Sequence, residues 1–180
     1  MTGKRLFVAI ELPDSTKRFL VDLDPQIHDV RWLYAEQMHL TLGFFGVVPE
    51  DVDLKLRERL SAIVFGAFFL PIVGVGTFPP KGPPKIIWIG VGRGHPHLFQ
   101  LHKRAADAAL AAGLEPDLRP WHPHISLARC QNISRQAIEP FLRQHADFDA
   151  GLVPIDALHL KSSLLTPEGS IYTTELTVSA

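Results

Sequence analysis

Two short segments with the same alternating pattern constrain this chain more than any other feature. His39-Leu40-Thr41-Leu42 and His124-Ile125-Ser126-Leu127 each place polar side chains at every second position, with aliphatic residues between them. Successive side chains of a β-strand point to opposite faces, so each segment predicts a strand with one polar and one apolar face. Because the segments lie 85 positions apart, in corresponding halves of the chain, they predict two similar halves that share a core.

The rest of the chain mixes strands and helices without a regular strand–helix–strand order. We expect strands over 4–11, 30–34, 38–46, 68–78, 85–91, 124–129, 157–165 and 170–178. We expect helices that begin at a capping Asp14 or Ser15, and over 49–64, 95–112 and 134–145. In the second of these helices the apolar side is expected to comprise Leu54, Leu56, Leu60 and Ile63. This order favours an α+β fold with antiparallel sheets, in one domain over 1–180.

Composition narrows the classes of function. Hydrophobic residues make up 46% and charged residues 21% of the chain, which excludes wholesale disorder. A formal net charge of −1 excludes a polybasic protein that coats nucleic acid, but leaves room for a small basic pocket. The uncharged stretch 60–80 is interrupted by glycine and proline, which favours a buried strand over a membrane span. Cys130 is the single cysteine, so a reducing, cytoplasmic compartment is expected.

The polar faces of the two repeated segments suit phosphodiester chemistry. Histidine has an ordinary pKa near 6.5, so one imidazole can act as a base while another acts as an acid. Hydroxyls such as those of Thr41 and Ser126 can donate hydrogen bonds to the non-bridging oxygens of a phosphate. If the two strands lie side by side, His39 and His124 can activate a nucleophile and protonate a leaving oxygen. This chemistry needs no metal ion.

The segments HLTLGFFG and WHPHISLAR resemble the two signature motifs of the two-histidine (2H) phosphoesterase superfamily. Within it the chain is similar to the RNA 2′,3′-cyclic phosphodiesterases, once called 2′–5′ RNA ligases. RLFVAIELP, FPPKGPPKIIWIGV and LKSSLLTPEGSIY resemble the opening strand, central strand pair and closing hairpin of that family, so the resemblance covers most of the chain. It implies a two-lobed α+β fold with pseudo-twofold symmetry and the active site in the groove between the lobes.

The resemblance also implies a reaction and the roles of particular residues. A terminal 2′,3′-cyclic phosphate is opened to a 2′-phosphate, with His39 as the proton donor and His124 as the proton acceptor. Thr41 and Ser126 would then hold the phosphate, and Arg129, just past the second motif, would neutralise developing charge. The chain has Ser126 where threonine is commoner. It also has Ser162 where many members have glutamate, so that carboxylate's contact is not expected here.

Further residues carry weaker predictions. Trp121, Phe44 and Tyr172 are candidates for stacking on a base, and Lys85 for a contact to RNA, although core packing or simple solvation would also explain them. The triplets His95-Pro96-His97 and His122-Pro123-His124 could ligate zinc, but no cysteine lies nearby. We therefore expect neither a metal nor a cofactor.

The expected partner is RNA, or an oligonucleotide, that ends in a 2′,3′-cyclic phosphate; no membrane is expected, and the protein is expected to be a monomer. Two alternatives remain open at this point. The same two histidines would serve the reverse reaction, ATP-independent 2′–5′ joining of tRNA halves. A non-catalytic module that binds RNA ends is the other alternative.

Overall fold

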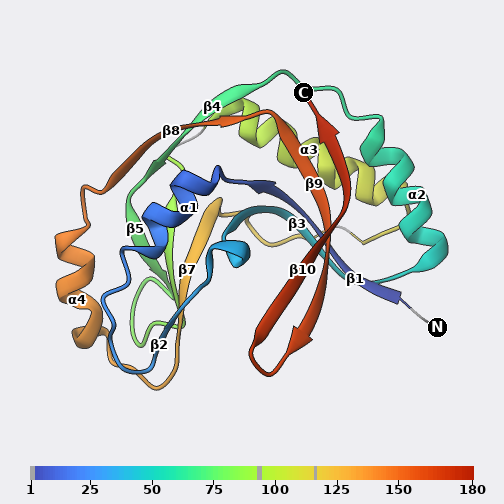
Figure 1. The fold of residues 1–180 in the computed structure, drawn as a ribbon. Helices are drawn as coiled ribbons and strands as arrows, with labels where there is room; N and C mark the ends of the chain where they lie inside the picture. Colours follow the sequence, from blue (N-terminus) through green and yellow to red (C-terminus); the bar gives the residue numbers. More distant parts are fainter. Residues whose placement is uncertain (1–2, 93–94, 116) are drawn as a thin grey trace.

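One antiparallel sheet of eight strands runs through the computed structural model, which describes residues 3–92, 95–115 and 117–180 (Figure 1). Its main path has the order β10-β9-β1-β3-β7-β6-β5, and β2 pairs with β7. These strands are β1 (Gly3–Glu11), β2 (Val30–Trp32), β3 (His39–Pro49), β5 (Val75–Phe78), β6 (Ile86–Gly90), β7 (His124–Cys130), β9 (Ala157–Thr166) and β10 (Gly169–Ser179). The two repeated segments begin β3 and β7, which are neighbours at the centre of the sheet.

Four helices and a second, two-stranded sheet complete the fold. The helices are α1 (Asp14–Val21), α2 (Glu50–Ser61), α3 (Pro96–Ala111) and α4 (Arg135–Gln144), with a short 3-10 helix η1 at Ala35–Gln37; the small sheet pairs β4 (Phe68–Val73) with β8 (Asp149–Ile155). Figure 1 shows α2 beside the β9–β10 end of the sheet and α4 at the opposite end. The α+β class with antiparallel sheets is therefore confirmed.

The apolar faces of the two repeated segments form the centre of the core. Leu40, Leu42, Ile125 and Leu127 are all buried, at 0 or 1% exposure. The core continues into α2 and α3 through Leu56, Leu60, Leu98, Leu101 and Ala105. Burial of a leucine or isoleucine side chain contributes about 1.5–3 kcal/mol, so the apolar face of each segment fixes its strand firmly. The polar side chains consequently point to the other side of the sheet.

The expected strand over 68–78 is two strands, which end in different sheets. Gly74 has a φ of 76°, a left-handed conformation that glycine adopts without strain, and it separates β4 from β5. As a result β4 pairs with β8, and β5 pairs with β6. The β8 strand was not expected, because Gly151 and Pro154 interrupt its pattern.

Two details of the expected helices are wrong. In α2 the buried positions are Asp53, Leu56 and Leu60, whereas Leu54 is 64% exposed. Asp53 lies on the inner face because Arg57, one turn later, binds its carboxylate at 2.8 Å. The start of α1 is also different: Pro13 is its N-cap, and Asp14 lies in the first turn instead of capping the helix.

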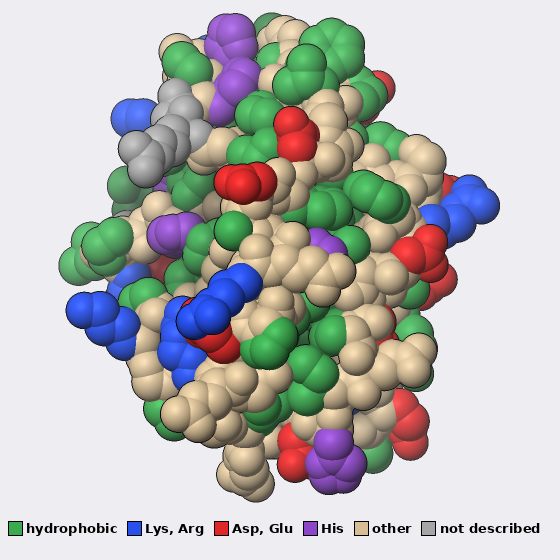
Figure 2. All heavy atoms as spheres, turned by 90° about the vertical axis from the view of Figure 1, so that its left-hand side faces the viewer, with side chains coloured by type: hydrophobic (Ala, Val, Ile, Leu, Met, Phe, Trp, Pro, Cys, Tyr) green, Lys and Arg blue, Asp and Glu red, His purple; other side chains and the backbone are tan. Residues whose placement is uncertain are grey.

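The surface carries charges of both signs. Figure 2 shows Lys and Arg side chains intermixed with Asp and Glu on the visible face, in keeping with the net charge of −1. Within the described residues, no helix combines the length and the hydrophobicity that crossing a membrane requires.

Candidate active site

The pairing of β3 with β7 brings the two histidines to one face of the sheet. Leu40 lies opposite Ile125 in this antiparallel ladder. One residue further in each direction, His39 lies opposite Ser126, and Thr41 lies opposite His124. The two histidines are then diagonal neighbours, a relation that spans about 7–8 Å in antiparallel sheets. That interval suits a phosphate held between two imidazoles.

A β-bulge follows each repeated segment and turns a further side chain to this face. In the β1–β3 ladder Leu42 has no partner, and in the β6–β7 ladder Leu127 has none. An extra residue on one strand reverses the alternation beyond it. Phe44 and Arg129, each five positions after its histidine, therefore point to the histidine face. Without the second bulge, Arg129 would point into the core.

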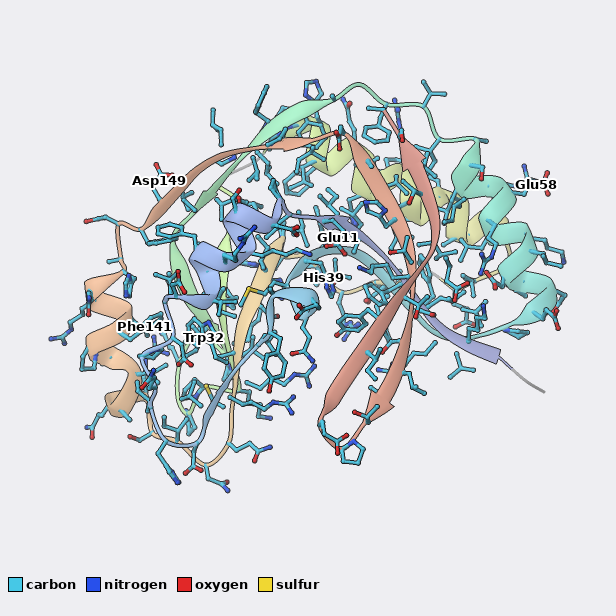
Figure 3. The ribbon with its side chains drawn as sticks, viewed as in Figure 1. Glu11, Trp32, His39, Glu58, Phe141 and Asp149 are labelled. Atoms are coloured by element: carbon cyan, nitrogen blue, oxygen red, sulfur yellow. The ribbon has the colours of Figure 1, made fainter. Side chains whose placement is uncertain are left out.

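A cavity of about 330 Å³ opens on this face beside His39. Its walls are Arg5, Phe7, His39, Thr41, Phe44, Arg129, Ser163, Leu165, Ser170 and Tyr172. β1, β3, β7 and the β9–β10 hairpin contribute these residues, and Figure 3 shows His39 at the centre of the molecule, beside that hairpin. This cavity therefore brings together five residues that the sequence predicts at the site: His39, Thr41, Phe44, Arg129 and Tyr172.

Two aromatic rings hold the imidazole of His39. It stacks on Phe7 at 4.9 Å between ring centroids, and Tyr172 meets it edge-on at 5.1 Å. Burial among these rings lowers the pKa of His39 from 6.5 to about 4, because the charged imidazolium loses its hydration. Nearby Glu11 acts in the opposite direction, while Lys161 and Lys17 lower the pKa further.

The imidazole of His124 has a defined tautomer. Its Nδ1 lies 2.6 Å from the backbone carbonyl of His122, so Nδ1 carries the proton that it donates, and Nε2 is free to accept one. Burial lowers the pKa of His124 below its ordinary value, so the neutral form dominates at pH 7. Gln37 lies two positions before His39, as His122 lies two positions before His124. Nδ1 of His39, however, has no hydrogen-bond partner among the described residues.

A second cavity, of about 410 Å³, adjoins the first one. Thr41 and Phe44 line both cavities, whereas His124 lines only the second. Its walls are mainly apolar and include several aromatic rings, among them those of Phe78, His122 and Trp121. Trp121 is held in place, since its ring stacks on His102 at 3.9 Å and its N–H donates to the carbonyl of Thr41 at 3.2 Å.

Two residues that the sequence predicts at the site, Lys85 and Ser126, do not line either cavity. Lys85 is exposed and lines neither of them, so the structure does not bring it to the site. Ser126 is half-buried on the histidine face, next to the cavities. Ser162 lies beside the Glu175 carboxylate, away from His39, and the residue on the wall is its neighbour Ser163. The difference from the family at Ser162 therefore concerns a side chain that faces away from the cavity.

A buried charge cluster next to His39 was not predicted. Glu11 lies opposite His39 in the β1–β3 ladder, and Figure 3 shows the two labelled residues close together. Its carboxylate accepts hydrogen bonds from Lys17 and Lys161, both of which are buried. Burial opposes the charge on Glu11, but the two lysines outweigh it and lower the pKa of this carboxyl. No sequence pattern marks these three residues as a group.

Neither histidine triplet forms a candidate metal site. Within residues 3–92, 95–115 and 117–180, no group of three or more His, Cys, Asp or Glu side chains is placed to hold a metal ion. His95 and His97 lie at the start of α3, where both pack near Phe68. His122 packs against Phe78 and Trp88.

Comparisons with known proteins agree with this geometry. Residues 12–165 match the family model of the 2′-5′ RNA ligase superfamily. The RNA 2′,3′-cyclic phosphodiesterase of Aeropyrum pernix is 35% identical over 81% of this chain and 83% of its own length. The RNA 2′,3′-cyclic phosphodiesterase of Archaeoglobus fulgidus is 30% identical over 93% of this chain and 96% of its own length. The fold matches a crystal structure from Thermus thermophilus with a TM-score of 0.79, at 25% identity and 97% coverage of both chains. It also matches apo LigT of Escherichia coli with a TM-score of 0.82, at 22% identity and with 99% and 98% coverage. The chain therefore belongs to the 2′-5′ RNA ligase superfamily.

Proposed function

We propose that this protein hydrolyses RNA 2′,3′-cyclic phosphate ends to 2′-phosphomonoesters, without a metal ion. The observation that carries the proposal is the diagonal pair His39 and His124 on one face of the β3–β7 ladder. The names of the curated relatives support the same reaction.

In the proposed mechanism Nε2 of His124 takes a proton from water, and the water oxygen forms a new bond to phosphorus. The bond from phosphorus to O3′ breaks on the opposite side, and His39 gives its proton to O3′. The phosphate remains on O2′, so the product is a 2′-phosphomonoester. Hydroxyls of Thr41 and Ser126 donate to the non-bridging oxygens, and Arg129 stabilises the negative charge that grows on them.

Protonation of His39 is coupled to binding of the substrate. With a pKa of about 4, this imidazole is neutral in the free protein at pH 7. The negative charge of a bound phosphate favours the imidazolium and raises its pKa. His39 thus becomes a competent acid chiefly when the phosphate is present.

Three further expectations belong to this proposal. Residues 1–180 form one domain of two pseudo-symmetric lobes, which is supported by the matching histidines and bulges of β3 and β7. The active unit is a monomer, since one chain supplies both histidines and both hydroxyls. The protein works in the cytoplasm, in keeping with its single cysteine, the buried Cys130.

The test uses a diadenosine that carries a terminal 2′,3′-cyclic phosphate, with and without EDTA. We expect a 2′-phosphate product in both conditions, identified by chromatography against the 2′- and 3′-phosphate standards, and about 10²- to 10⁴-fold slower formation of it with His124→Ala. A 3′-phosphate product, or loss of activity with EDTA, would contradict the proposal. Binding without turnover would indicate a module that only recognises RNA ends. A joined product with a 5′-hydroxyl oligonucleotide would indicate the ligase reaction.

A further inference from the structure

The cavity beside His39 has the chemistry of an anion site. Arg5 and Arg129 both line it, and none of the described residues on its walls is an aspartate or a glutamate. Arg31 lies directly opposite Arg129 in the β2–β7 ladder and adds to the positive potential. The chain as a whole has a net charge of −1, so the two guanidiniums on the wall of this cavity make it locally positive.

Arg5 is arranged to bind an anion from outside. Its guanidinium lies over the ring of Phe44, 4.7 Å from the centroid, and among the described residues it forms no ion pair. Stacking holds the guanidinium plane and leaves its N–H groups free for a phosphate. The neighbouring Lys4 differs, because Glu175 on the other face of the sheet binds its ammonium at 2.9 Å.

The second cavity does not offer the same chemistry. Its walls are mainly apolar and aromatic, and its charged residues are Glu115, Asp117 and Arg119. The guanidinium of Arg119 binds Asp117 at 2.6 Å, so Glu115 leaves this set with a net negative charge. A second phosphate is therefore disfavoured near these carboxylates, whereas a base or a ribose finds aromatic surface in this cavity.

The ribose links these two environments to the two histidines. In a 2′,3′-cyclic nucleotide, O3′ leads through C3′, C4′, C5′ and O5′ to the preceding phosphate, whereas O2′ lies nearer the base. In the proposed mechanism O3′ leaves beside His39, which lines the cavity with Arg5 and Arg129. His124 lines the second cavity, which has the aromatic walls. The preceding phosphate therefore falls on the side of Arg5.

We infer that the Arg5 side of the cavity beside His39 is a subsite for the phosphate on the 5′ side of the terminal nucleotide, and that Arg5 is its specificity-determining residue, while His39, Thr41 and Arg129 in the same cavity act on the cyclic phosphate. This inference rests on the proposed function, and it names the substrate more closely. The protein binds two neighbouring phosphates of its substrate, the cyclic phosphate and the phosphate on its 5′ side. Its preferred substrate is thus an oligonucleotide end, not a free cyclic mononucleotide.

The test compares adenosine 2′,3′-cyclic phosphate with its 5′-phosphorylated form, which differs only in the phosphate concerned, and with the diadenosine. For the wild type we expect kcat/KM to be at least about 10-fold higher with the 5′-phosphate, mainly through KM. A charge-assisted hydrogen bond of about 1.5–3 kcal/mol corresponds to about 10- to 160-fold. With Arg5→Gln this ratio is expected to fall to about 1. Arg5→Lys, which keeps the charge but not the planar fork, is expected to give an intermediate ratio.

Arg59→Gln provides the matched control, because Arg59 is exposed on α2 and lines neither cavity. This variant is expected to keep the wild-type ratio. A wild type without preference for the 5′-phosphate would overturn the inference, as would an unchanged ratio in both Arg5 variants. Hydrolysis of none of the three substrates by the wild type would instead refute the proposed function, so the two failures are distinguishable.

Discussion

The pH dependence of kcat/KM follows directly from the burial of the two histidines. The reaction uses His39 protonated and His124 neutral, and the pH dependence of kcat/KM reports the pKa values of these groups in the free protein. With a pKa of about 4, His39 holds its proton in only about one molecule in a thousand at pH 7. Since the pKa of His124 is also lowered from 6.5, the maximum lies midway between about 4 and a value below 6.5, hence below about pH 5.3. Above that maximum kcat/KM falls as pH rises, approaching about 10-fold per pH unit.

The assay measures initial rates with the diadenosine cyclic phosphate in buffers of constant ionic strength, from about pH 4 to 9. The phosphodiesters of the substrate keep the same charge throughout this range, and its adenines are neutral above about pH 5, so changes in rate above that pH report on the protein. We expect the falling limb of kcat to lie at higher pH than that of kcat/KM, because bound phosphate raises the pKa of His39. A kcat/KM that is flat or increasing between about pH 6 and 8 would refute this reasoning, as would a falling limb that persists in His39→Ala.

The remaining predictions concern stability and salt. Glu11→Gln leaves the ammoniums of Lys17 and Lys161 buried without their carboxylate. Urea denaturation is expected to show a free energy of unfolding that is lower by about 3–5 kcal/mol. A loss below about 1 kcal/mol would show that the cluster contributes little. Because the pKa of His39 is lower in the folded state, its contribution to stability is present above about pH 6.5 and is lost as pH falls towards 4. The loss amounts to about 3 kcal/mol, at about 1.36 kcal/mol per pKa unit. Urea midpoints should therefore decrease less over this pH range for His39→Gln than for the wild type. If two phosphates are contacted, log(kcat/KM) plotted against log salt concentration should have a slope near about −1.4; a slope of −4 or steeper would indicate a longer RNA track.

The repeated segments made the centre of the fold predictable. Their alternation settles which side chains enter the core, and Leu40 and Ile125 are fully buried as expected. That both segments belong to neighbouring strands was an assumption, because pairing between distant strands is decided by the whole core. The structure supplies that pairing.

The place of Arg129 illustrates what alternation alone cannot give. Counting along the strand puts it on the same face as Ile125, in the core, and only the bulge at Leu127 turns it to the histidine face. Its expected role came from the resemblance to a family, not from the pattern. A bulge is a local irregularity in strand pairing, and no residue type in the β7 sequence HISLARC indicates one.

The wall contributed by β1 was also hidden in the sequence. LFVAI, from Leu6 to Ile10, is apolar at every position, because β1 is a central strand buried on both faces. Alternation is lost in such a run, so nothing singled out Phe7 as the ring beneath His39. The lowered pKa of His39 was missed for the same reason. The sequence predicts an ordinary imidazole, and its burial depends on rings from two other strands.

The central claim is that two histidines from distant parts of the chain act on one phosphate. The most direct measurement is kcat/KM of His39→Ala, His124→Ala and the double variant with the diadenosine cyclic phosphate, against His28→Ala, whose imidazole is 94% exposed. Each single active-site variant is expected to lose about 10²- to 10⁴-fold. The double variant should lose less than the product of the two single losses, because both groups act in one transition state. Near-normal rates in either single variant, with His28→Ala also normal, would contradict the account.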